Sequence, residues 1–325
     1  MLNSKRIASA FILALMFAPF TAYGQARAAP LKTVKVGTLK IAALTNAWLA
    51  KKEGFFEKNG LNVQFVEFKS GSEAIFAQRG GDVDIILSIP GTVMVAHERG
   101  FDLVAIAQNE TAKSVAPDSG ALIVAKDSNI RSLKDLEGKK IATSAMRTQQ
   151  AVAMLGAIKK AGGDVSKVKV VEIPYPSHAD VLRSKQVDAV APLDPFSTQI
   201  LSSGNGKVLS YYYVETLPEQ PLGAWFVKKT WIRGHEDIIT AFGKSLRESI
   251  DYLVADPVRA RKLVAAYTGL DPELVKSMPM INWSYKVDPA KWQGVIQMMR
   301  EGGELKKDHK AEEYFSEQIK VFIKQ

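Results

Sequence analysis

The stretch 82-DVDIILSIPGTVMVAHERGFDLVAIAQN-109 decides the fold class. Its apolar run at 82–88 predicts a strand, 92–100 predicts a helix, and 103–109 predicts a further strand. Strands and helices that alternate in this way are typical of an α/β fold with a largely parallel sheet. The turn Ser88-Ile-Pro-Gly-Thr92 is either a plain connection or a helix start whose N–H groups are free for a ligand.

The alternation continues on both sides of this stretch. Strands are predicted at 33–39 and 61–68, with a helix at 46–58 between them and Ser72 as the N-cap of the next helix. A second series of strands begins near residue 121, and the pattern is mostly helical beyond about residue 230. A chain of this length has enough residues for two α/β lobes.

The first 28 residues predict a cleaved secretory signal peptide. Lys5 and Arg6 precede an apolar run at 7–20, and small residues then offer cleavage before Gln25 or before Ala29. An uncleaved membrane anchor is the alternative. No later stretch approaches the roughly 18 apolar residues of a membrane-spanning helix. We therefore expect the mature protein in the periplasm, without a lipid anchor because the chain has no cysteine to carry one.

Composition excludes several kinds of site. The absence of cysteine rules out disulfides, thiolate metal sites and a cysteine nucleophile. The formal charge of +9 falls to +7 without Lys5 and Arg6, or to +6 if Arg27 is also removed. This excess is spread along the chain, so it indicates a solvated surface that favours anions and does not indicate nucleic-acid binding.

Enzyme motifs are also missing from the sequence. Its four histidines are scattered without the spacing of a metal site, and no nucleophile elbow or P-loop occurs. We expect neither a metal nor another cofactor, and no catalytic residue.

Several segments resemble one family when they are taken in order. They are AKKEGFFEKNGLNV (50–63), GSEA with RGGDVDI (71–85), VAKDSNIRSLKDLEGKKIA (124–142) and VDAVAPLDPF (187–196). The chain over 33–200 resembles the periplasmic solute-binding proteins of ABC importers. The nearest group takes nitrate, taurine, aliphatic sulfonates and thiamine-pyrimidine precursors.

The resemblance implies a fold and a function. The fold would be the two-lobed periplasmic binding protein fold (type II), with lobe one at 31–117 and 217–325, lobe two at 118–216, and a ligand cleft between them. A monomer would capture a small anionic or zwitterionic molecule, such as a sulfonate, taurine, nitrate or a carboxylate. It would deliver this ligand to a membrane permease that has a separate ATPase. The alternatives are a pyrimidine or aromatic ligand, and an enzyme of the same superfamily of the pyrimidine-synthesis type.

The expected ligand contacts lie at strand ends, because open α/β sheets bind ligands beyond the carboxyl ends of their strands. Each has a structural alternative: Lys40 can be solvated, Ser72 can be only a cap, and Phe196 and Trp225 can be core residues. From lobe one we expect contacts from Lys40, Thr45, Ser70, Gly71, Ser72, Ser88, Pro90, Gly91, Thr92, Gln108 and Asn109; from lobe two and the return to lobe one we expect Ser144, Arg147, Thr148, Asp194, Phe196 and Trp225.

Arg147 is a departure from the family pattern. Related proteins often carry Gly-Ser where this chain has Arg147 and Thr148. Thr148 keeps the hydroxyl, and Arg147 either clamps a carboxylate or sulfonate or points outward.

Overall fold

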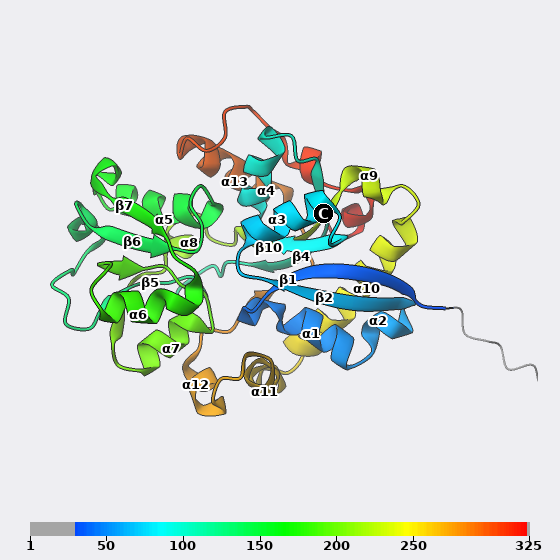
Figure 1. Cartoon of the computed structure of the whole chain (residues 1–325), viewed down its shortest axis with the longest axis horizontal. Helices are drawn as coiled ribbons and strands as arrows, with labels where there is room; N and C mark the ends of the chain where they lie inside the picture. Colours follow the sequence, from blue (N-terminus) through cyan, green and yellow to red (C-terminus); the bar gives the residue numbers. More distant parts are fainter. Residues whose placement is uncertain (1–29, 324–325) are drawn as a thin grey trace, which may run out of the picture. The chain divides into compact units, whose positions relative to one another are not determined.

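The computed structural model describes residues 30–323. The predicted signal peptide and both of its cleavage sites lie outside the described residues. Within the described part, no helix is both long and apolar enough to cross a membrane. The chain from Leu31 onward forms one compact unit that contains two β-sheets (Figure 1).

The first sheet has six strands in the order β11-β4-β10-β3-β1-β2 among the described residues. β1 pairs in parallel with β2 and β3, whereas β10 runs antiparallel to β3 and β4, and β11 runs antiparallel to β4. The strands are β1 (Lys32–Leu39), β2 (Leu61–Phe68), β3 (Ile85–Ser88), β4 (Leu103–Thr111), β10 (Pro221–Lys228) and β11 (Asn282–Trp283).

The second sheet has five strands in the order β7-β6-β8-β5-β9 over the described range. β6 pairs in parallel with β7 and β8, and β5 pairs antiparallel with β8 and β9. The strands are β5 (Leu122–Ala125), β6 (Lys140–Thr143), β7 (Lys169–Glu172), β8 (Ala189–Val190) and β9 (Gly206–Ser210).

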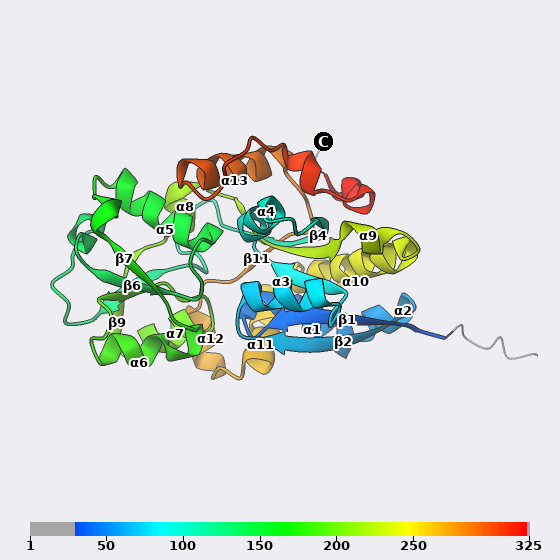
Figure 2. The ribbon, with the colours of Figure 1, turned by 45° about the horizontal axis from the view of Figure 1, so that its top comes forward.

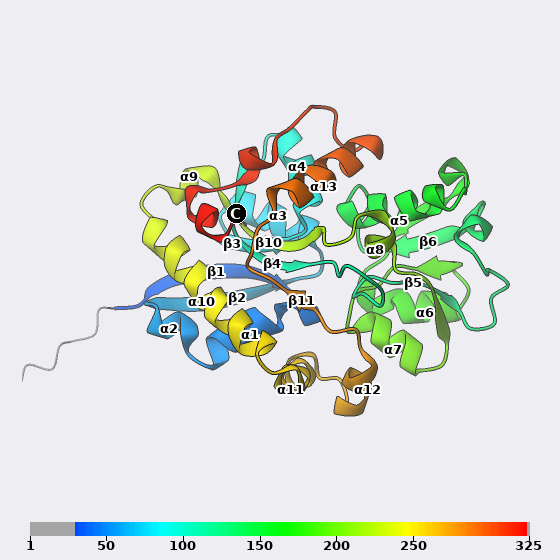
Figure 3. The same ribbon diagram turned by 180° about the vertical axis from the view of Figure 1, so that it is seen from behind.

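Both sheets are mostly parallel, as expected: in the first sheet β10 and β11 run against the other four strands, and in the second β5 runs against the other four, among the described residues. The chain crosses from β4 to β5 and returns from β9 to β10, as Figure 3 shows from behind. The returning strand β10 lies between β3 and β4 and runs against both. The direction of a strand that enters from another sheet is not contained in local periodicity. The lobe bounds at 117 and 217 stay a prediction.

Helices cover both faces of the first sheet and flank the second. One apolar cluster packs α1 and α10 on the first sheet, and another packs α3, α4 and α13 on it (Figure 2). The helices are α1 (Thr45–Lys52), α2 (Phe55–Lys58), α3 (Gly71–Gly80), α4 (Pro90–Glu98), α5 (Gln149–Lys160), α6 (His178–Arg183), α7 (Phe196–Ser202), α8 (Tyr212–Thr216), α9 (Lys229–Ile232), α10 (Glu236–Val254), α11 (Pro257–Thr268), α12 (Pro272–Ser277) and α13 (Pro289–Glu301).

Two local expectations differ from the structure. The helix expected at 46–58 is two helices, because Gly54 has a left-handed φ of 71° and interrupts it between α1 and α2. The N-cap of α3 is Ser70, whose hydroxyl accepts the N–H of Glu73, and not Ser72. A glycine at the first helical position separates the two serines, and both fit the sequence pattern of a cap.

The two sheets are joined by the side-chain amide of Gln149, at the start of α5. Its Oε1 accepts the backbone N–H of Gly91 in α4 at 2.8 Å, and its Nε2 donates to Gln220 Oε1 and to the carbonyl of Pro221, each at 2.8 Å. Gln149 is fully buried. These bonds tie the second sheet's main helix to the helix after β3 and to the start of β10.

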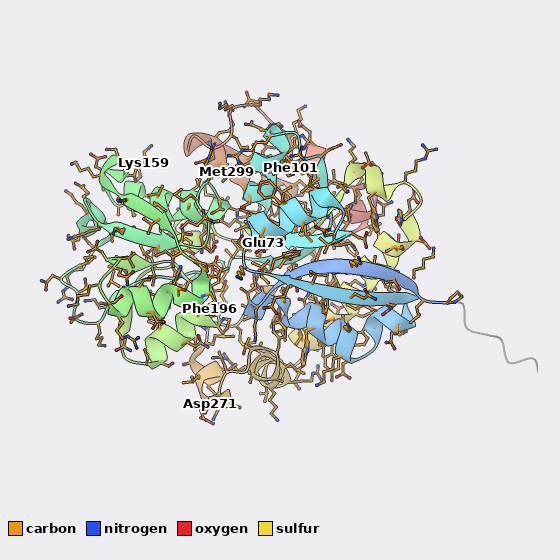
Figure 4. The ribbon with its side chains drawn as sticks, viewed as in Figure 1. Glu73, Phe101, Lys159, Phe196, Asp271 and Met299 are labelled. Carbon is orange, nitrogen blue, oxygen red and sulfur yellow. The ribbon has the colours of Figure 1, made fainter. Side chains whose placement is uncertain are left out.

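Gly91 is needed for this close approach. A Cβ at Gly91 would lie 2.9 Å from the Cβ of Gln149 and 2.9 Å from the sulfur of Met299, which Figure 4 labels on α13. Any larger residue would push α4, α5 and α13 apart. The Pro-Gly pair after β3 therefore has a structural reason: Pro90 starts the helix with fixed φ, and Gly91 admits its neighbours.

We expect Gly91→Ala to lower the free energy of unfolding by about 1–3 kcal/mol, since overpacking of a tight contact costs this much. Gly243→Ala is the matched control: it also lies inside a helix, α10, but its added Cβ would be 3.4 Å from Phe322, an ordinary contact. The control should be neutral or stabilising because alanine is the better helix former. Urea denaturation measures both, and equal effects in the two variants would contradict the tight junction.

Candidate functional site

A cavity of about 90 Å³ lies between the two sheets. This is several times the roughly 10–15 Å³ that one ordered water needs, so it has room for a small molecule. From the side of the first sheet it is lined by Leu39, Ile41, Ala43, Gly71, Ser72, Leu87, Ser88, Ile89, Thr92, Glu110, Leu222 and Ile281; from the crossing and the second sheet it is lined by Ser119, Ser144, Ala145, Thr148, Gln150, Tyr175, Leu193, Asp194 and Tyr213.

The cavity lies where strands of both sheets end. Ser88 is the last residue of β3, Leu39 is the last of β1, and Ser144 directly follows β6. The carboxyl ends of these strands converge on one space, which is the usual ligand position in open α/β sheets. Strand direction in the two sheets thus places residues from distant parts of the chain around one cavity.

Seven of the residues expected from the sequence line the cavity, namely Gly71, Ser72, Ser88, Thr92, Ser144, Thr148 and Asp194. Their contact with a ligand stays a prediction. The other ten lie outside the lining: Lys40, Thr45, Ser70, Pro90, Gly91, Gln108, Asn109, Arg147, Phe196 and Trp225. Most of this second group already has a partner within the protein.

Asn109 holds the first sheet to α1 instead of facing the cavity. Its Oδ1 accepts from Asn46 Nδ2 at 2.9 Å and from Trp225 Nε1 at 3.0 Å, and its Nδ2 donates to the carbonyl of Ala43 at 3.2 Å. Trp225 and Asn109 are fully buried. Both are therefore parts of the core.

The remaining uncharged residues outside the lining also have structural contacts. Thr45 donates its hydroxyl to the carbonyl of Ala42, and Gln108 accepts from Trp292 Nε1 at 3.0 Å. Phe196, labelled in Figure 4, stacks on Tyr175 with ring centroids 6.0 Å apart. Phe196 thus supports the cavity wall from behind Tyr175, which lines it.

Arg147 does not line the cavity. Its Nε donates to Glu304 Oε2 at 2.7 Å, and its side chain is 54 % exposed. The backbone of Arg147 is left-handed, with φ of 59°. Lys40 is exposed as well. Neither of the two expected cations stands in the lining, which contains no lysine, arginine or histidine among the described residues.

Two hydroxyl groups in the cavity wall lack partners. Ser88 Oγ and Thr92 Oγ1 are buried without a hydrogen bond to any described residue. Both residues are more than nine-tenths buried, at 5 % and 8 % exposure. A buried hydroxyl without a partner costs about 1–3 kcal/mol, so a bound molecule that satisfies these groups recovers this free energy.

The two carboxylate oxygens of Asp194 have different surroundings. Its Oδ1 accepts from the hydroxyl of Ser197 and from the N–H and hydroxyl of Thr198 at the start of α7. Its Oδ2 is buried without a partner among the described residues. Burial raises the pKa of Asp194, while the bonds from Ser197 and Thr198 lower it. One carboxylate oxygen therefore anchors the helix, and the other is left for the cavity.

Glu110, near the end of β4, is the residue that sequence reasoning missed. It is 6 % exposed, and its carboxyl has no hydrogen bond to a described residue. Burial, together with the charge of Asp118, raises its pKa from 4.5 to about 8. The ladder between β4 and β10 is irregular beside it, and a Cβ on the facing Gly223 would lie 3.0 Å from Glu110 Oε1. Glycine at this irregularity leaves room for the carboxyl.

Gln150 and Tyr175 form the wall on the side of the second sheet. Gln150 Oε1 accepts from the hydroxyls of Tyr175 and Thr143, each at 2.9 Å, and its Nε2 donates to Tyr212 and to the carbonyl of Ala191. Burial raises the pKa of Tyr175 to about 12. This wall is neutral and rigid, because every polar group of Gln150 is used.

A known protein family matches most of the chain. A family model described as NMT1/THI5 like matches residues 42–260, about two-thirds of the chain. The chain belongs to the NMT1/THI5-like family.

Two curated proteins are similar to the chain in sequence. The taurine-binding periplasmic protein of Escherichia coli is 26 % identical over 206 residues, which are 62 % of this chain and 61 % of that protein. A putative thiamine biosynthesis protein of Haemophilus influenzae is 25 % identical over 282 residues, 82 % of this chain and 85 % of that protein. The chain thus spans less than two thirds of the taurine-binding relative.

Solved structures share the fold. The alkanesulfonate-binding protein of Xanthomonas axonopodis pv. citri, bound to MOPS, has a TM-score of 0.72 at 19 % identity and covers 91 % of this chain and 99 % of its own. A desulfurization enzyme has a TM-score of 0.64 at 14 % identity, with 89 % of this chain and 98 % of its own covered. The two-lobed periplasmic binding protein fold expected from the sequence is confirmed.

The titration of Glu110 gives a prediction for stability. Folding raises its pKa, so between pH 4.5 and about 8 the folded protein holds a proton that the unfolded chain has released. Stability falls as pH rises through this window, by about 1.4 kcal/mol per pH unit for one group, and the loss ends above the folded pKa. Glu110→Gln removes this contribution.

Urea denaturation of ligand-free protein at pH 5, 6, 7 and 8 measures the effect. We expect Glu110→Gln to gain stability relative to the wild type as the pH rises across this series. Glu57→Gln is the control, since Glu57 is exposed on α2. Parallel pH profiles for the wild type and Glu110→Gln would contradict a buried Glu110 carboxyl.

Proposed function

We propose that the protein is the periplasmic solute-binding component of an ABC importer. It captures a small molecule in the cavity between its two sheets and presents it, as a monomer, to a membrane permease with a separate ATPase. One observation carries this proposal: a cavity at the strand ends holds three buried polar atoms that no described residue satisfies, namely Ser88 Oγ, Thr92 Oγ1 and Asp194 Oδ2. A relative named as a taurine-binding periplasmic protein supports it.

The proposed capture depends on polar groups that come from both sheets. Ser88 and Thr92 belong to the first sheet and its helix, whereas Asp194 belongs to the second sheet. A ligand that bonds to both sides holds the two sheets together around itself. The bond from the Gly91 N–H to the Gln149 amide already joins the two sheets beside this space. Closure buries the ligand, and a permease that recognises the closed arrangement receives only loaded protein.

An enzyme of the same fold is the second candidate function, favoured by the likeness to a desulfurization enzyme. The cavity offers little for catalysis, because its lining has no histidine, lysine or arginine within the described residues. Burial raises the pKa of Glu110, but no nucleophile among the described residues is hydrogen-bonded to it. We therefore propose binding without chemical conversion.

Thermal unfolding against a panel of small molecules tests the binding function. Protein that begins at Gln25 or Ala29 is unfolded and refolded to remove bound material. It is then mixed with taurine, alkanesulfonates, nitrate, carboxylates, aminopyrimidines or amines. A ligand at about 100 times its Kd adds about 2.7 kcal/mol and raises Tm by several degrees. We expect at least one such response, with the ligand recovered chemically unchanged. No response, together with no small molecule in native mass spectrometry of unstripped protein, would contradict the proposal.

The double variant Ser88→Ala with Thr92→Val locates the binding. We expect it to keep the wild-type Tm without ligand, or to exceed it, because two unpartnered buried hydroxyls are removed. Its affinity for the responding ligand should fall about tenfold or more, measured by calorimetry. Ser202→Ala with Thr240→Val removes two exposed hydroxyls and should bind as the wild type does. Equal affinities in the two double variants would place the ligand elsewhere.

A further inference from the structure

The ionisable groups around the cavity are acidic or phenolic. Glu110 and Asp194 line it from opposite sheets, and Asp118 lies in the crossing beside the lining residue Ser119. The charge of Asp118 acts on both Glu110 and Asp194. Within the described part of the chain, the basic group whose charge acts on this set is Lys113, and it acts on Asp118.

The two lining carboxyls have unused acceptor capacity. Asp194 Oδ2 has no partner, and the Glu110 carboxyl has no hydrogen bond to any described residue. The side chains are at least nine-tenths buried, at 2 % and 6 % exposure. Buried carboxylates are stabilised by a cation or by donors, and otherwise they take up a proton.

The neighbouring hydroxyls give an independent sign of a ligand. Ser88 Oγ and Thr92 Oγ1 are also buried and unpartnered, and they line the same cavity. A hydroxyl can accept a hydrogen bond, and all four groups can thus receive N–H donors from one molecule. The apolar lining, which includes Leu39, is suited to the carbon skeleton of such a molecule.

We propose that the ligand carries a cationic nitrogen, an ammonium or amidinium group, which Glu110 and Asp194 hold from opposite sheets. This inference rests on the proposed binding function and names its ligand class. The ligand's positive charge would then be the cationic partner of these carboxyls, since no described lysine, arginine or histidine lines the cavity. Ionic hydrogen bonds to carboxylates are the stronger class, so the cationic nitrogen becomes the group that draws the two sheets together.

This ligand class differs from the anionic one expected from the sequence. The anion clamp needed Arg147, which is paired with Glu304 outside the cavity. A sulfonate placed beside Glu110 and Asp194 would meet two acids and no base. The described lining has no lysine or arginine to balance a sulfonate's charge, whereas an ionised carboxyl there would repel it.

Matched probes that share a skeleton and differ in charge test the proposal. The first set is benzylamine, benzamidine, benzyl alcohol, benzoate and benzenesulfonate, and the second is butylamine and butanesulfonate. Refolded full-length mature protein is mixed with each at pH 7, and Tm and calorimetric affinity are measured. We expect the amines and benzamidine to raise Tm, and the carboxylate and sulfonates to leave it unchanged.

Variants connect the response to the two carboxyls. Glu110→Gln and Asp194→Asn should each weaken amine binding about tenfold or more. Glu110→Gln is expected to be at least as stable as the wild type, so its loss of binding cannot come from unfolding. Glu57→Gln should bind as the wild type does. Retained affinity in Glu110→Gln and Asp194→Asn would overturn the assignment.

The outcomes separate this inference from the binding function. Responses only to benzoate or the sulfonates would overturn the cationic ligand and leave the solute-binding function standing. Absence of any response to the amine and amidine probes would also overturn it. An amine response that disappears in Glu110→Gln and in Asp194→Asn supports both.

Discussion

The contact between Gly91 and Gln149 is the constraint on which the arrangement of the two sheets depends. A backbone N–H at the start of α4 donates to the Gln149 amide, and the missing Cβ of Gly91 allows α5 and α13 to approach. The amide also binds Gln220 and Pro221, where the chain re-enters the first sheet. Helix, strand entry and neighbouring sheet are thus fixed by one side chain.

This contact explains the Pro-Gly turn after β3. Free N–H groups at a helix start can hold an anion, but here the N–H of Gly91 already has an acceptor within the protein. Among the described lining residues, the unpaired groups include the hydroxyls of Ser88 and Thr92 and one carboxyl oxygen of Asp194. The fold therefore uses its helix start for the junction between the sheets and leaves side chains for the cavity.

The charge of the cavity also follows from which strand ends meet there. Polar strand ends from two sheets meet in one space, and no described lysine, arginine or histidine lines it. Burial then opposes ionisation of Glu110 and Asp194. Two ionised carboxyls in this space would therefore be unfavourable unless a proton or a cation binds there. Burial of these carboxyls thus lowers the stability of the ligand-free protein and also provides the groups that a ligand can bind.

Local sequence patterns predicted the α/β class, the main strands and the family, because hydrophobic period and turn residues are local properties. They also placed Ser88, Thr92 and Asp194 in the turns that follow strands, and all three line the cavity. They did not predict β10's direction or the role of Glu110, because these depend on pairing between distant segments. Likewise, nothing near Arg147 in the sequence indicates its partner Glu304.

Contacts between distant segments also explain why the structural roles of some residues were not predicted from the sequence. Asn109 and Trp225 are polar or amphipathic residues near strand ends, and such residues are natural candidates for ligand contact. The hydrogen bonds that engage them come from Asn46 in α1 and from each other. Only the three-dimensional pairing distinguishes a buried structural amide from one that faces a cavity.

A crystal structure of the mature protein with its most strongly stabilising ligand tests the central claim most directly. The account predicts that this ligand occupies the cavity between the two sheets, within hydrogen-bonding distance of Ser88, Thr92 and Asp194. A ligand bound at any other site, with only water in the cavity, would contradict it.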